Sequence, residues 1–251
     1  MKFYRRLSAI KAISFDLDDN LYSNRPVMLA IEKKMVVYFA CVLNAKQHKL
    51  ASPDKSFNQQ YWYTFKQQAI SQQVDIVHDV VQVRLASYRL GLEHLGFSAA
   101  VAQQMARAAV DYFISLRSDF TVPASSKQLL ATLSKRYPLV AISNGNVDTQ
   151  ALGLSQYFQH IYHAGWQANG QLLKQKPASD MFALACQELA IKPQQLLHVG
   201  DCGRADIQGA LNAGCQAAWL SCYDVGKPIS VLPHLEISNI NLLKLLLKKS
   251  V

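Results

Sequence analysis

The chain has 251 residues, of which 50% are hydrophobic and 17% are charged, and its formal net charge is +9. This composition excludes a disordered chain, which needs fewer apolar residues and more charge to remain unfolded. The length suffices for one sizeable core, or for a core with a smaller appended domain.

The basic excess is spread along the chain. Residues 1–22 carry four basic and three acidic side chains, and residues 23–122 and 123–251 each carry eleven basic and seven acidic ones. A nucleic-acid-binding protein more often concentrates Lys and Arg on one element. The charge therefore favours a small anionic substrate, or serves only solubility, and we expect no nucleic-acid partner.

Cysteines and apolar runs indicate the compartment. The five cysteines are odd in number and form no C-x-x-C pair, so neither a disulfide framework nor a thiolate zinc site is indicated. The longest apolar stretch, Met35 to Leu43, is far shorter than the roughly 20 residues that span a bilayer. Lys11 and Asp16 interrupt the N-terminal apolar run before a signal peptide forms. We expect a soluble, cytoplasmic protein with no membrane partner.

The predicted elements begin with a buried strand, in which Ile10, Ile13 and Phe15 lead into a group of acids. From Met28 to Val42, apolar residues recur at steps of three and four, which places them on one helix face. Similar stripes over residues 77–95 and 101–116 predict further helices that pack on one another.

After Pro123, strands and helices alternate. The predicted strands are 139–143, 160–163, 196–201 and 217–220, and the predicted helices are 125–135, 179–190 and 205–213. Parallel strands need crossovers, so the alternation predicts parallel βαβ units. The N-terminal strand needs a sheet in which to pair. We therefore expect residues 1–22 and 123–251 to form one α/β domain, and residues 23–122 to form an inserted helical domain.

Two acids follow the first strand directly. Asp16 and Asp18 are two residues apart, so their side chains project to the same side. Two neighbouring carboxylates repel, and such a pair is tolerated when a cation shares it or when one carboxyl keeps its proton. By itself the pattern is weak, because roughly 0.6 D-x-D patterns arise by chance at this composition. An acidic turn that caps a strand has the same letters.

A second pair of acids follows a later strand. Asp201 comes after Gly200, which permits a close backbone approach, and Asp206 stands five residues further on. A turn followed by an N-capped helix is an equally good reading of these residues, because Asp206 also complements a helix dipole.

A hydroxyl and a lysine complete the polar residues at strand ends. Ser143 and Asn144 supply a hydroxyl and a turn whose N–H groups suit phosphate oxygens. Lys176 stands before Pro177, which can start the next helix, although a loop lysine is usually just solvated. Ligands of open α/β sheets bind at the C-terminal edge of the strands, so these segments indicate one site.

The chain resembles the haloacid dehalogenase superfamily, whose motifs are an acid pair, a hydroxyl, a lysine and a second acid pair in this order. The resemblance covers residues from Lys11 to about Leu220. The resemblance implies an α/β core with a Rossmann-like doubly wound parallel sheet, and a helical cap domain over residues 23–122. Residues 15–26 and the segment His198-Val199-Gly200-Asp201 look most like the bacterial YigB-type phosphatases. Those enzymes are associated with 5-amino-6-(5-phospho-D-ribitylamino)uracil in riboflavin and FMN biosynthesis.

The resemblance implies a Mg²⁺-dependent phosphatase that acts on a small phosphorylated metabolite. Asp16 would be the nucleophile that becomes an aspartyl phosphate, and Asp18 would be the general acid and base. The side chains of Asp16 and Asp201 and the carbonyl of Asp18 would bind Mg²⁺, with Asp206 supporting the metal's waters. The residues expected to hold the phosphate oxygens are Ser143, Asn144 and Lys176.

Several positions leave alternatives open. Asn20 stands where the family often has Thr or Val, and Cys202, where an acid or Ser is frequent, is a packed residue or an oxidation-sensitive thiol, with packing favoured. His198 receives no catalytic role. Arg25 is either a substrate contact or a solvated hinge residue. Residues 61–63 either stack on a planar ring or, as we favour, pack within the cap.

The motifs also fit other activities of the superfamily, such as a sugar phosphate or nucleotide phosphatase, a phosphomutase or a dehalogenase. Asp18 favours a phosphatase, because a dehalogenase has less use for a second acid. A non-catalytic phosphate-binding or RNA-binding protein is the alternative from another class. The sequence does not indicate the oligomeric state.

Overall fold

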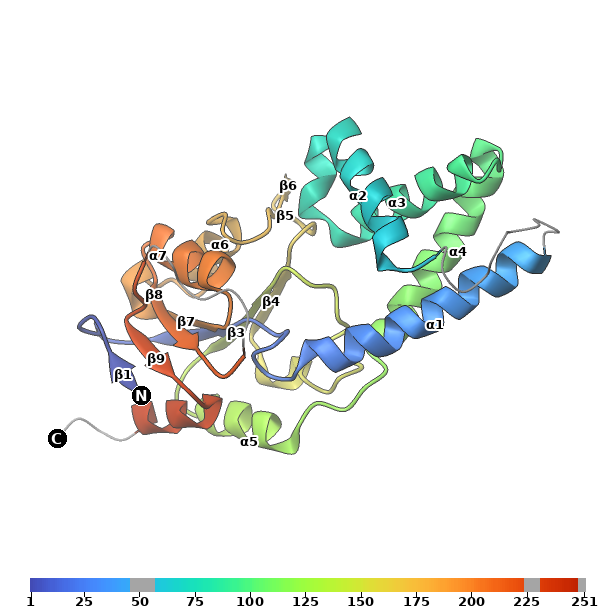
Figure 1. Cartoon of the computed structure of the whole chain (residues 1–251). Coiled ribbons are helices and arrows are strands. Elements are labelled where there is room, and N and C mark those ends of the chain that lie inside the picture. The colour runs from blue at the N-terminus through green and yellow to red at the C-terminus, as the bar shows by residue number, and fades with distance from the viewer. Residues whose placement is uncertain (46–56, 224–230, 248–251) are drawn as a thin grey trace. The chain divides into compact units, whose positions relative to one another are not determined.

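The computed structural model describes residues 1–45, 57–223 and 231–247. The chain divides into two compact units (Figure 1). The first comprises Met1–Asn24 and Thr121–Val251, and we call it the α/β unit. The second comprises Arg25–Phe120, and we call it the helical unit.

The α/β unit is built on a seven-stranded sheet in the order β1-β9-β8-β7-β2-β3-β4. All neighbouring strands are parallel except the pair of β1 and β9. Every residue of β2, β3 and β7 is buried, which explains why these strands read as mostly apolar runs, with Ser14 and His198 as polar exceptions in β2 and β7. The strands are β1 (Lys2–Phe3), β2 (Ala12–Phe15), β3 (Leu139–Ser143), β4 (His160–His163), β7 (Leu196–Gly200), β8 (Gln216–Leu220) and β9 (Leu235–Ile237).

Helices cover both faces of this sheet. Helix α5 (Ala124–Leu133) and the segment η5 (Ile240–Leu247) lie on one face, and α6 (Asp180–Glu188) and α7 (Gly209–Asn212) lie on the other (Figure 1). The short helical segments η2 (Ser155–Tyr157) and η3 (Pro193–Gln195) precede β4 and β7. The prediction of a doubly wound, mostly parallel sheet is confirmed.

The predicted helix over residues 205–213 differs from the structure. A π-helical segment, η4 (Gly203–Gln208), occupies its first half and a single α-helical turn, α7, follows it. The cause is a widened first turn, in which the carbonyl of Cys202 accepts hydrogen bonds from both Asp206 N and Ile207 N. This turn carries the side chain of Asp206 to the end of the sheet.

A small hairpin in the α/β unit escaped the sequence analysis. Strands β5 (Gln167–Ala168) and β6 (Gln171–Leu172) pair antiparallel around Asn169 and Gly170, whose φ angles are 49° and 75°. Positive φ at both turn residues is what an Asn-Gly pair favours, so this dipeptide was the signal for the hairpin. The strand β9, only three residues long, gave no such signal.

The helical unit contains α1 (Asn24–Ala45), which begins one residue before the boundary, α2 (Gln59–Gln72), η1 (Val74–His78), α3 (Val80–His94) and α4 (Ala99–Arg117). The three apolar stripes of the sequence correspond to α1, to η1 with α3, and to α4. Helix α2 was missed because glutamines interrupt its apolar pattern. Its start is marked by Asn58, whose side chain accepts a hydrogen bond from Tyr61 N.

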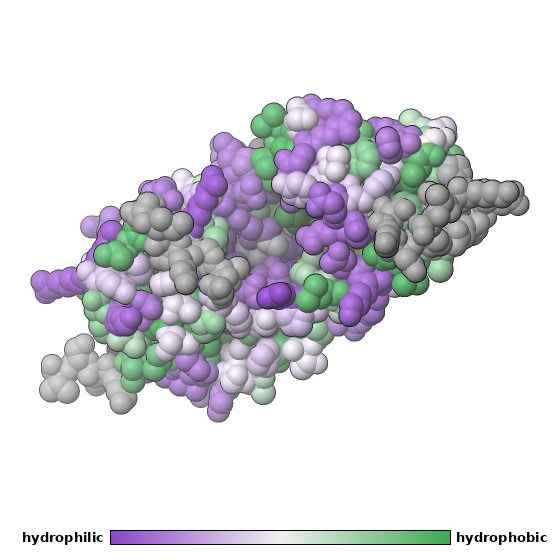
Figure 2. All heavy atoms as spheres, viewed as in Figure 1, coloured by the Kyte–Doolittle hydropathy of each residue, from purple (hydrophilic) through white to green (hydrophobic). Residues whose placement is uncertain are grey.

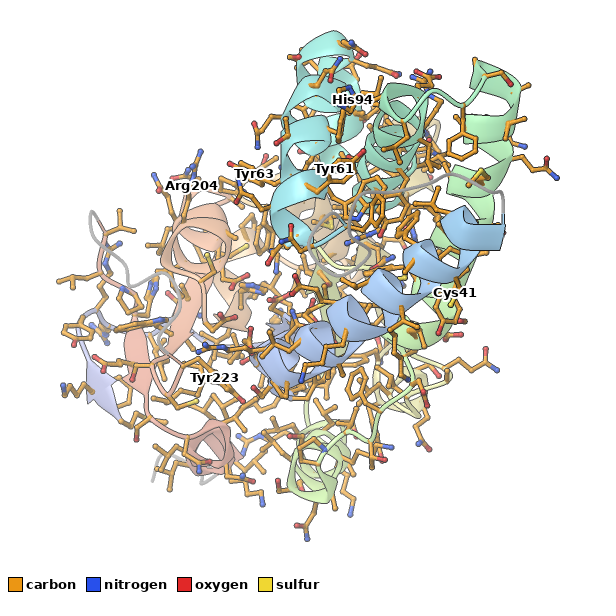
Figure 3. All side chains as sticks on the ribbon, turned by 45° about the vertical axis from the view of Figure 1, so that its right-hand side comes forward. Cys41, Tyr61, Tyr63, His94, Arg204 and Tyr223 are labelled. Carbon is orange, nitrogen blue, oxygen red and sulfur yellow. The ribbon has the colours of Figure 1, made fainter. Side chains whose placement is uncertain are left out.

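Aromatic side chains form the core of the helical unit. The ring of Phe39 lies 4.4 Å from that of Trp62 and 5.0 Å from that of Tyr88, measured between centroids. Tyr61 also packs here, and its hydroxyl donates to the carbonyl of Gly91. Packing is therefore confirmed for Tyr61 and Trp62, whereas Tyr63, which lies on another side of α2, is 51% exposed (Figure 3).

The surface mixes polar and apolar side chains. On the face drawn in Figure 2, hydrophilic residues are distributed over both units and interspersed with hydrophobic ones. Within the described ranges, no helix has the length and apolar character that crossing a bilayer requires.

Replacing Phe39 should test the aromatic core. Phe39 is 1% exposed, and Phe39→Ala removes a ring that contacts several others, so we expect a loss of about 3–5 kcal/mol in the free energy of unfolding. Val37 lies on the same helix and is 62% exposed, so Val37→Ala is the matched control, with an expected change within about 0.5 kcal/mol. Urea-induced unfolding measures both values, and similar losses for the two variants would contradict this description of the core.

Candidate active site

The C-terminal ends of β2, β3 and β7 border a cavity of about 200 Å³ within the α/β unit. The predicted site residue Asp206 also lies at this end of the sheet. The predicted site residue Arg25 belongs to the helical unit, where it is exposed near the start of α1. The cavity is lined by Asp16, Asp18, Asp19, Ser143, Asn144, Gly145, Lys176, Asp201, Cys202 and Ala205.

The first acids are fixed by the backbone that follows β2. The N–H of Asp16 donates to the carbonyl of Val199 in the neighbouring strand, at 2.9 Å. The amide of Asn20 donates to the carbonyls of Asp16 and Val199, at 2.8 and 3.0 Å, so Asn20 ties the two strand ends together. The hydroxyl of Tyr22 donates to Oδ1 of Asp18 at 2.6 Å and orients this carboxylate.

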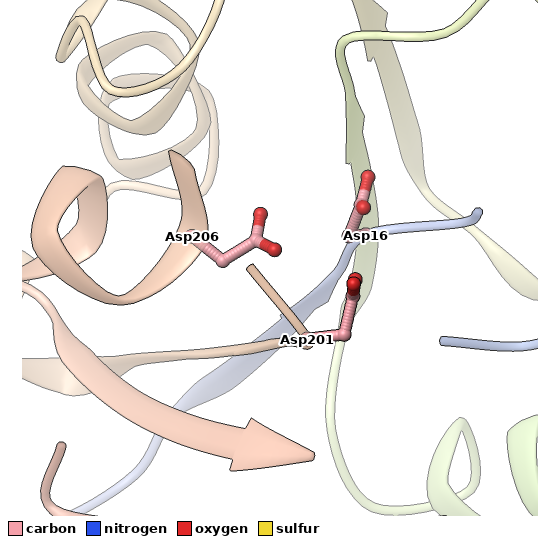
Figure 4. A group of neighbouring side chains, drawn as sticks. All are labelled: Asp16, Asp201 and Asp206. Atoms are coloured by element: carbon pink, nitrogen blue, oxygen red, sulfur yellow. The ribbon is translucent and has the colours of Figure 1, made fainter. Parts of the chain in front are cut away.

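The second acids depend on a glycine. A Cβ on Gly200 would lie 2.3 Å from Cγ of Asp206, so only glycine leaves room for this buried carboxylate. Oδ2 of Asp206 accepts from the N–H of Cys202 at 2.9 Å. The indole of Trp219 donates to the carbonyl of Asp201 at 2.8 Å and holds the loop after β7. Asp16, Asp201 and Asp206 gather at this edge from three different elements (Figure 4).

Lys176 connects the two groups of acids. Its ammonium lies 2.8 Å from Oδ1 of Asp16, 2.7 Å from Oδ1 of Asp206 and 2.7 Å from the carbonyl of Ile142. These three acceptors match the three protons of an ammonium. Lys176 is 3% exposed and is therefore not a solvated loop lysine, whereas Lys174 in the same loop is exposed to solvent.

The loop after β3 is held by its own hydrogen bonds. The hydroxyl of Ser143 accepts from Gly145 N at 3.0 Å, and the carbonyl of Gly145 accepts from Nδ1 of His163 at 2.7 Å. The amide of Asn144 both donates to the carbonyl of Lys176 and accepts from its N–H, which ties this loop to the lysine loop. The side-chain oxygen and nitrogen of Asn144 are therefore both engaged by the lysine loop.

Burial and mutual repulsion perturb the acids. Burial raises the pKa of Asp16 to about 7, and Asp206 and Asp18 add to this, although the Lys176 ammonium opposes it. Burial also raises the pKa of Asp201 to about 9, with contributions from Asp206 and Asp16. For Asp206, the Lys176 ammonium and the neighbouring imidazole outweigh burial and hold the pKa below its usual value. The Lys176 ammonium thus stabilises the ionised form of Asp206, but it does not fully offset the burial and repulsion that disfavour the ionised forms of Asp16 and Asp201.

These residues fit a divalent cation. Three carboxylates against one ammonium leave a charge of −3 + 1 = −2 when all are ionised, and all candidate ligands are oxygens, as Mg²⁺ prefers. One oxygen from each acid lies within 4.8 Å of the others, close to the roughly 4.2 Å between opposite ligands of Mg²⁺. Because N–H groups engage both oxygens of Asp206, Asp16 and Asp201 are the better direct ligands.

Two residues lie behind the lysine, of which sequence reasoning gave His198 no catalytic role and did not consider Ser14. Ser14 and His198 are neighbours in the register of β2 and β7, and both are completely buried. The imidazole of His198 contacts Ser14 on one side and Asp206 on the other. The signal was present, because a polar residue inside a buried strand needs a partner. Cys202, by contrast, is half-buried at the cavity, and its Sγ accepts from Ala205 N at 3.4 Å, so it is not simply a core residue.

Comparison with known proteins places this geometry in a family. The model of the haloacid dehalogenase-like hydrolases matches residues 10–214. The 5-amino-6-(5-phospho-D-ribitylamino)uracil phosphatase YigB of Escherichia coli is 35% identical over 244 residues, which cover 96% of this chain and 97% of that protein. The human N-acylneuraminate-9-phosphatase is 26% identical over an alignment of 258 residues, which covers 93% of this chain and 92% of that protein.

A solved structure agrees with these matches. The crystal structure of a 2-haloacid dehalogenase from Pseudomonas syringae pv. Tomato DC3000 matches with a TM-score of 0.81 and 26% identity, covering 95% of this chain and 98% of that one. The sheet, the acids and the buried lysine follow the order expected for this family, and the family model covers most of the chain. The chain therefore belongs to the haloacid dehalogenase-like hydrolase family.

Proposed function

We propose that the chain is a Mg²⁺-dependent phosphatase that hydrolyses a phosphate monoester of a small metabolite through an aspartyl phosphate on Asp16. The observation that carries this proposal is the placement of Asp16 and Asp18 in one cavity, with Asp16 held 2.8 Å from the ammonium of Lys176. A nucleophilic carboxylate needs a nearby cation when a phosphate dianion approaches it.

The first half of the proposed reaction is phosphoryl transfer. A carboxylate oxygen of Asp16 forms a bond to phosphorus while the bond from phosphorus to the ester oxygen breaks. The carboxyl group of Asp18 gives its proton to the departing alkoxide, so an alcohol leaves. Ser143, Lys176 and the N–H of Asn144 hold the oxygens of the transferring group.

The second half is hydrolysis of the acyl phosphate. Asp18, now a carboxylate, takes a proton from water, and the water oxygen forms a bond to phosphorus. The bond between phosphorus and the Asp16 oxygen then breaks, which releases inorganic phosphate and restores both carboxyl groups. The hydrogen bond from Tyr22 to Asp18 orients the group that performs both proton transfers.

Asp16, Asp201 and the carbonyl of Asp18 would hold Mg²⁺, and Asp206 would support it. When bound, the ion supplies positive charge that offsets the repulsion between the phosphate ester and the carboxylates.

The substrate is proposed from the relatives. The YigB phosphatase of Escherichia coli aligns over nearly the full length of both chains, which favours 5-amino-6-(5-phospho-D-ribitylamino)uracil and hence a cytoplasmic role in riboflavin and FMN synthesis. N-acylneuraminate 9-phosphate and phosphoglycolate are alternatives, because phosphatases named for them also match. The helical unit would act as the cap domain that selects among such metabolites, with Arg25 as a candidate contact.

A dehalogenase is the second candidate, favoured by the TM-score of 0.81 to a 2-haloacid dehalogenase. Both activities use the same nucleophile, but a halide leaves without a proton. The deciding experiment measures phosphate release from the named phosphates, with Mg²⁺ and with chelator, and halide release from a 2-haloacid. We expect Mg²⁺-dependent phosphate release that Asp16→Asn abolishes. Halide release alone, or phosphate release that survives Asp16→Asn, would overturn the proposal.

Replacing Asp18 should distinguish the general acid from the nucleophile. Asp18→Asn cannot protonate an alkoxide, so we expect kcat/KM for an alkyl phosphate to fall by about 10²–10⁴-fold. The loss should be much smaller for the phosphorylation step with p-nitrophenyl phosphate, whose leaving group needs no proton. Asp180→Asn removes an acid of α6 outside the cavity and is the control. Equal losses on both substrates would contradict the role of Asp18.

Metal binding should be visible without turnover. Mg²⁺ that binds only the folded protein raises its midpoint of thermal unfolding, and we expect Asp201→Asn to abolish this rise. In the absence of Mg²⁺, the same variant should unfold at a higher temperature than the wild type, because it removes the cost of burying the Asp201 carboxylate and its repulsion by Asp206 and Asp16. A Mg²⁺-dependent rise of wild-type size in Asp201→Asn would show that the ion binds elsewhere.

A further inference from the structure

A buried hydrogen-bonded chain extends behind the proposed active site. It runs from the hydroxyl of Ser14 to Nδ1 of His198, at 2.9 Å, and from Nε2 of His198 to Oδ1 of Asp206, at 3.2 Å. The same oxygen of Asp206 accepts from the ammonium of Lys176, which in turn contacts Asp16. Ser14, His198 and Asp206 are each 0% exposed, so the chain is shielded from bulk solvent.

The chemistry of the partners determines how His198 is protonated. Burial lowers the pKa of the His198 imidazole and the Lys176 ammonium adds to this, whereas Asp206 opposes it, and the net downward shift favours the neutral ring. A neutral imidazole has one N–H, and the carboxylate of Asp206 can only accept a hydrogen bond. The proton therefore lies on Nε2, and Nδ1 accepts the hydroxyl proton of Ser14.

Packing fixes the plane of this ring. The ring of Phe182, from α6, meets the imidazole edge to face, with 4.9 Å between centroids and 89° between planes. The pairing of Ser14 with His198 in the parallel register of β2 and β7 sets the other end. The imidazole is thus oriented from three sides, by a strand neighbour, an aromatic ring and a carboxylate.

We propose that Ser14 and His198 form a positioning pair, in which Ser14 fixes the Nε2–H tautomer of His198 and His198 orients Asp206 so that it shares the Lys176 ammonium with Asp16. The pair acts through Asp206 and does not touch the substrate. It rests on the proposed function for its kinetic consequence, but its geometry does not depend on that function.

The consequence for Lys176 follows from the arrangement of acceptors. Oδ1 of Asp206 receives hydrogen bonds from both His198 and Lys176, while Oδ2 is held by the N–H of Cys202. Without the imidazole donor, Oδ1 keeps only the hydrogen bond from Lys176, and the ammonium is drawn toward Asp206. Lys176 then serves Asp16 and an arriving phosphate less well, although all catalytic side chains remain.

Nitrogen NMR of the histidine side chains tests the tautomer directly. The chain has seven histidines, and the signals of His198 are those that disappear in His198→Gln. At neutral pH we expect a protonated Nε2 and a non-protonated Nδ1 for His198. A protonated Nδ1, or two protonated nitrogens, would overturn the proposal.

Substitutions test the positioning. His198→Leu removes both hydrogen bonds, and we expect kcat/KM and the affinity for inorganic phosphate with Mg²⁺ to fall by about tenfold to a hundredfold. His198→Gln retains an N–H near the place of Nε2, so it should keep most of the wild-type kcat/KM and most of the wild-type affinity for inorganic phosphate. The matched control is His160→Leu, since His160 also stands in a strand and contacts a carboxylate, that of Glu188, at 3.3 Å. It should leave both values unchanged.

A purely structural role predicts different results. His198→Leu and His198→Gln would then lose activity in proportion to their loss of thermal stability, with no rescue by glutamine, and this outcome would overturn the positioning role. A wild type that neither turns over a phosphate ester nor binds phosphate would refute the proposed function. In that case the nitrogen spectra, together with the site of the Lys176 ammonium in a crystal structure of His198→Leu, still decide the present proposal.

Discussion

The site depends on one electrostatic constraint: a single buried ammonium holds two carboxylates together at the end of a parallel sheet. Lys176 contacts Asp16 and Asp206, and this contact favours the ionised form of both. A charge pair this deeply buried is stable only when its remaining hydrogen bonds are satisfied. The carbonyl of Ile142 and the N–H of Cys202 supply two of them.

The fold around this constraint serves to bring the charges close. Gly200 removes the Cβ that would collide with Asp206, and the widened turn of η4 carries Asp206 toward the lysine. The parallel register places the ends of β2 and β7 side by side, and Asn20 joins them. The ammonium compensates only part of the negative charge, so the same geometry that buries the acids also creates the demand for a divalent cation.

The sequence predicted the parts that depend on local pattern. Apolar runs followed by acids located β2 and β7, and helical periodicity located most of the helical unit. The roles of Asp16 and Lys176 came from the resemblance to a family, since spacing alone favoured an acidic turn and a solvated lysine. A polar residue within a buried strand signals that Ser14 and His198 each need a partner, but that they partner one another depends on the register of two strands that are far apart in the sequence.

The central claim is that Asp16, held beside Lys176, is the carboxylate that receives a phosphoryl group. A crystal structure of the protein with Mg²⁺ and beryllium trifluoride, which mimics a phosphoryl group on a carboxylate, tests this claim most directly. The account predicts beryllium bound to a carboxylate oxygen of Asp16, with its fluorides contacting Ser143 and Lys176. Beryllium trifluoride on another carboxylate, with Asp16 unmodified and still paired with Lys176, would contradict it.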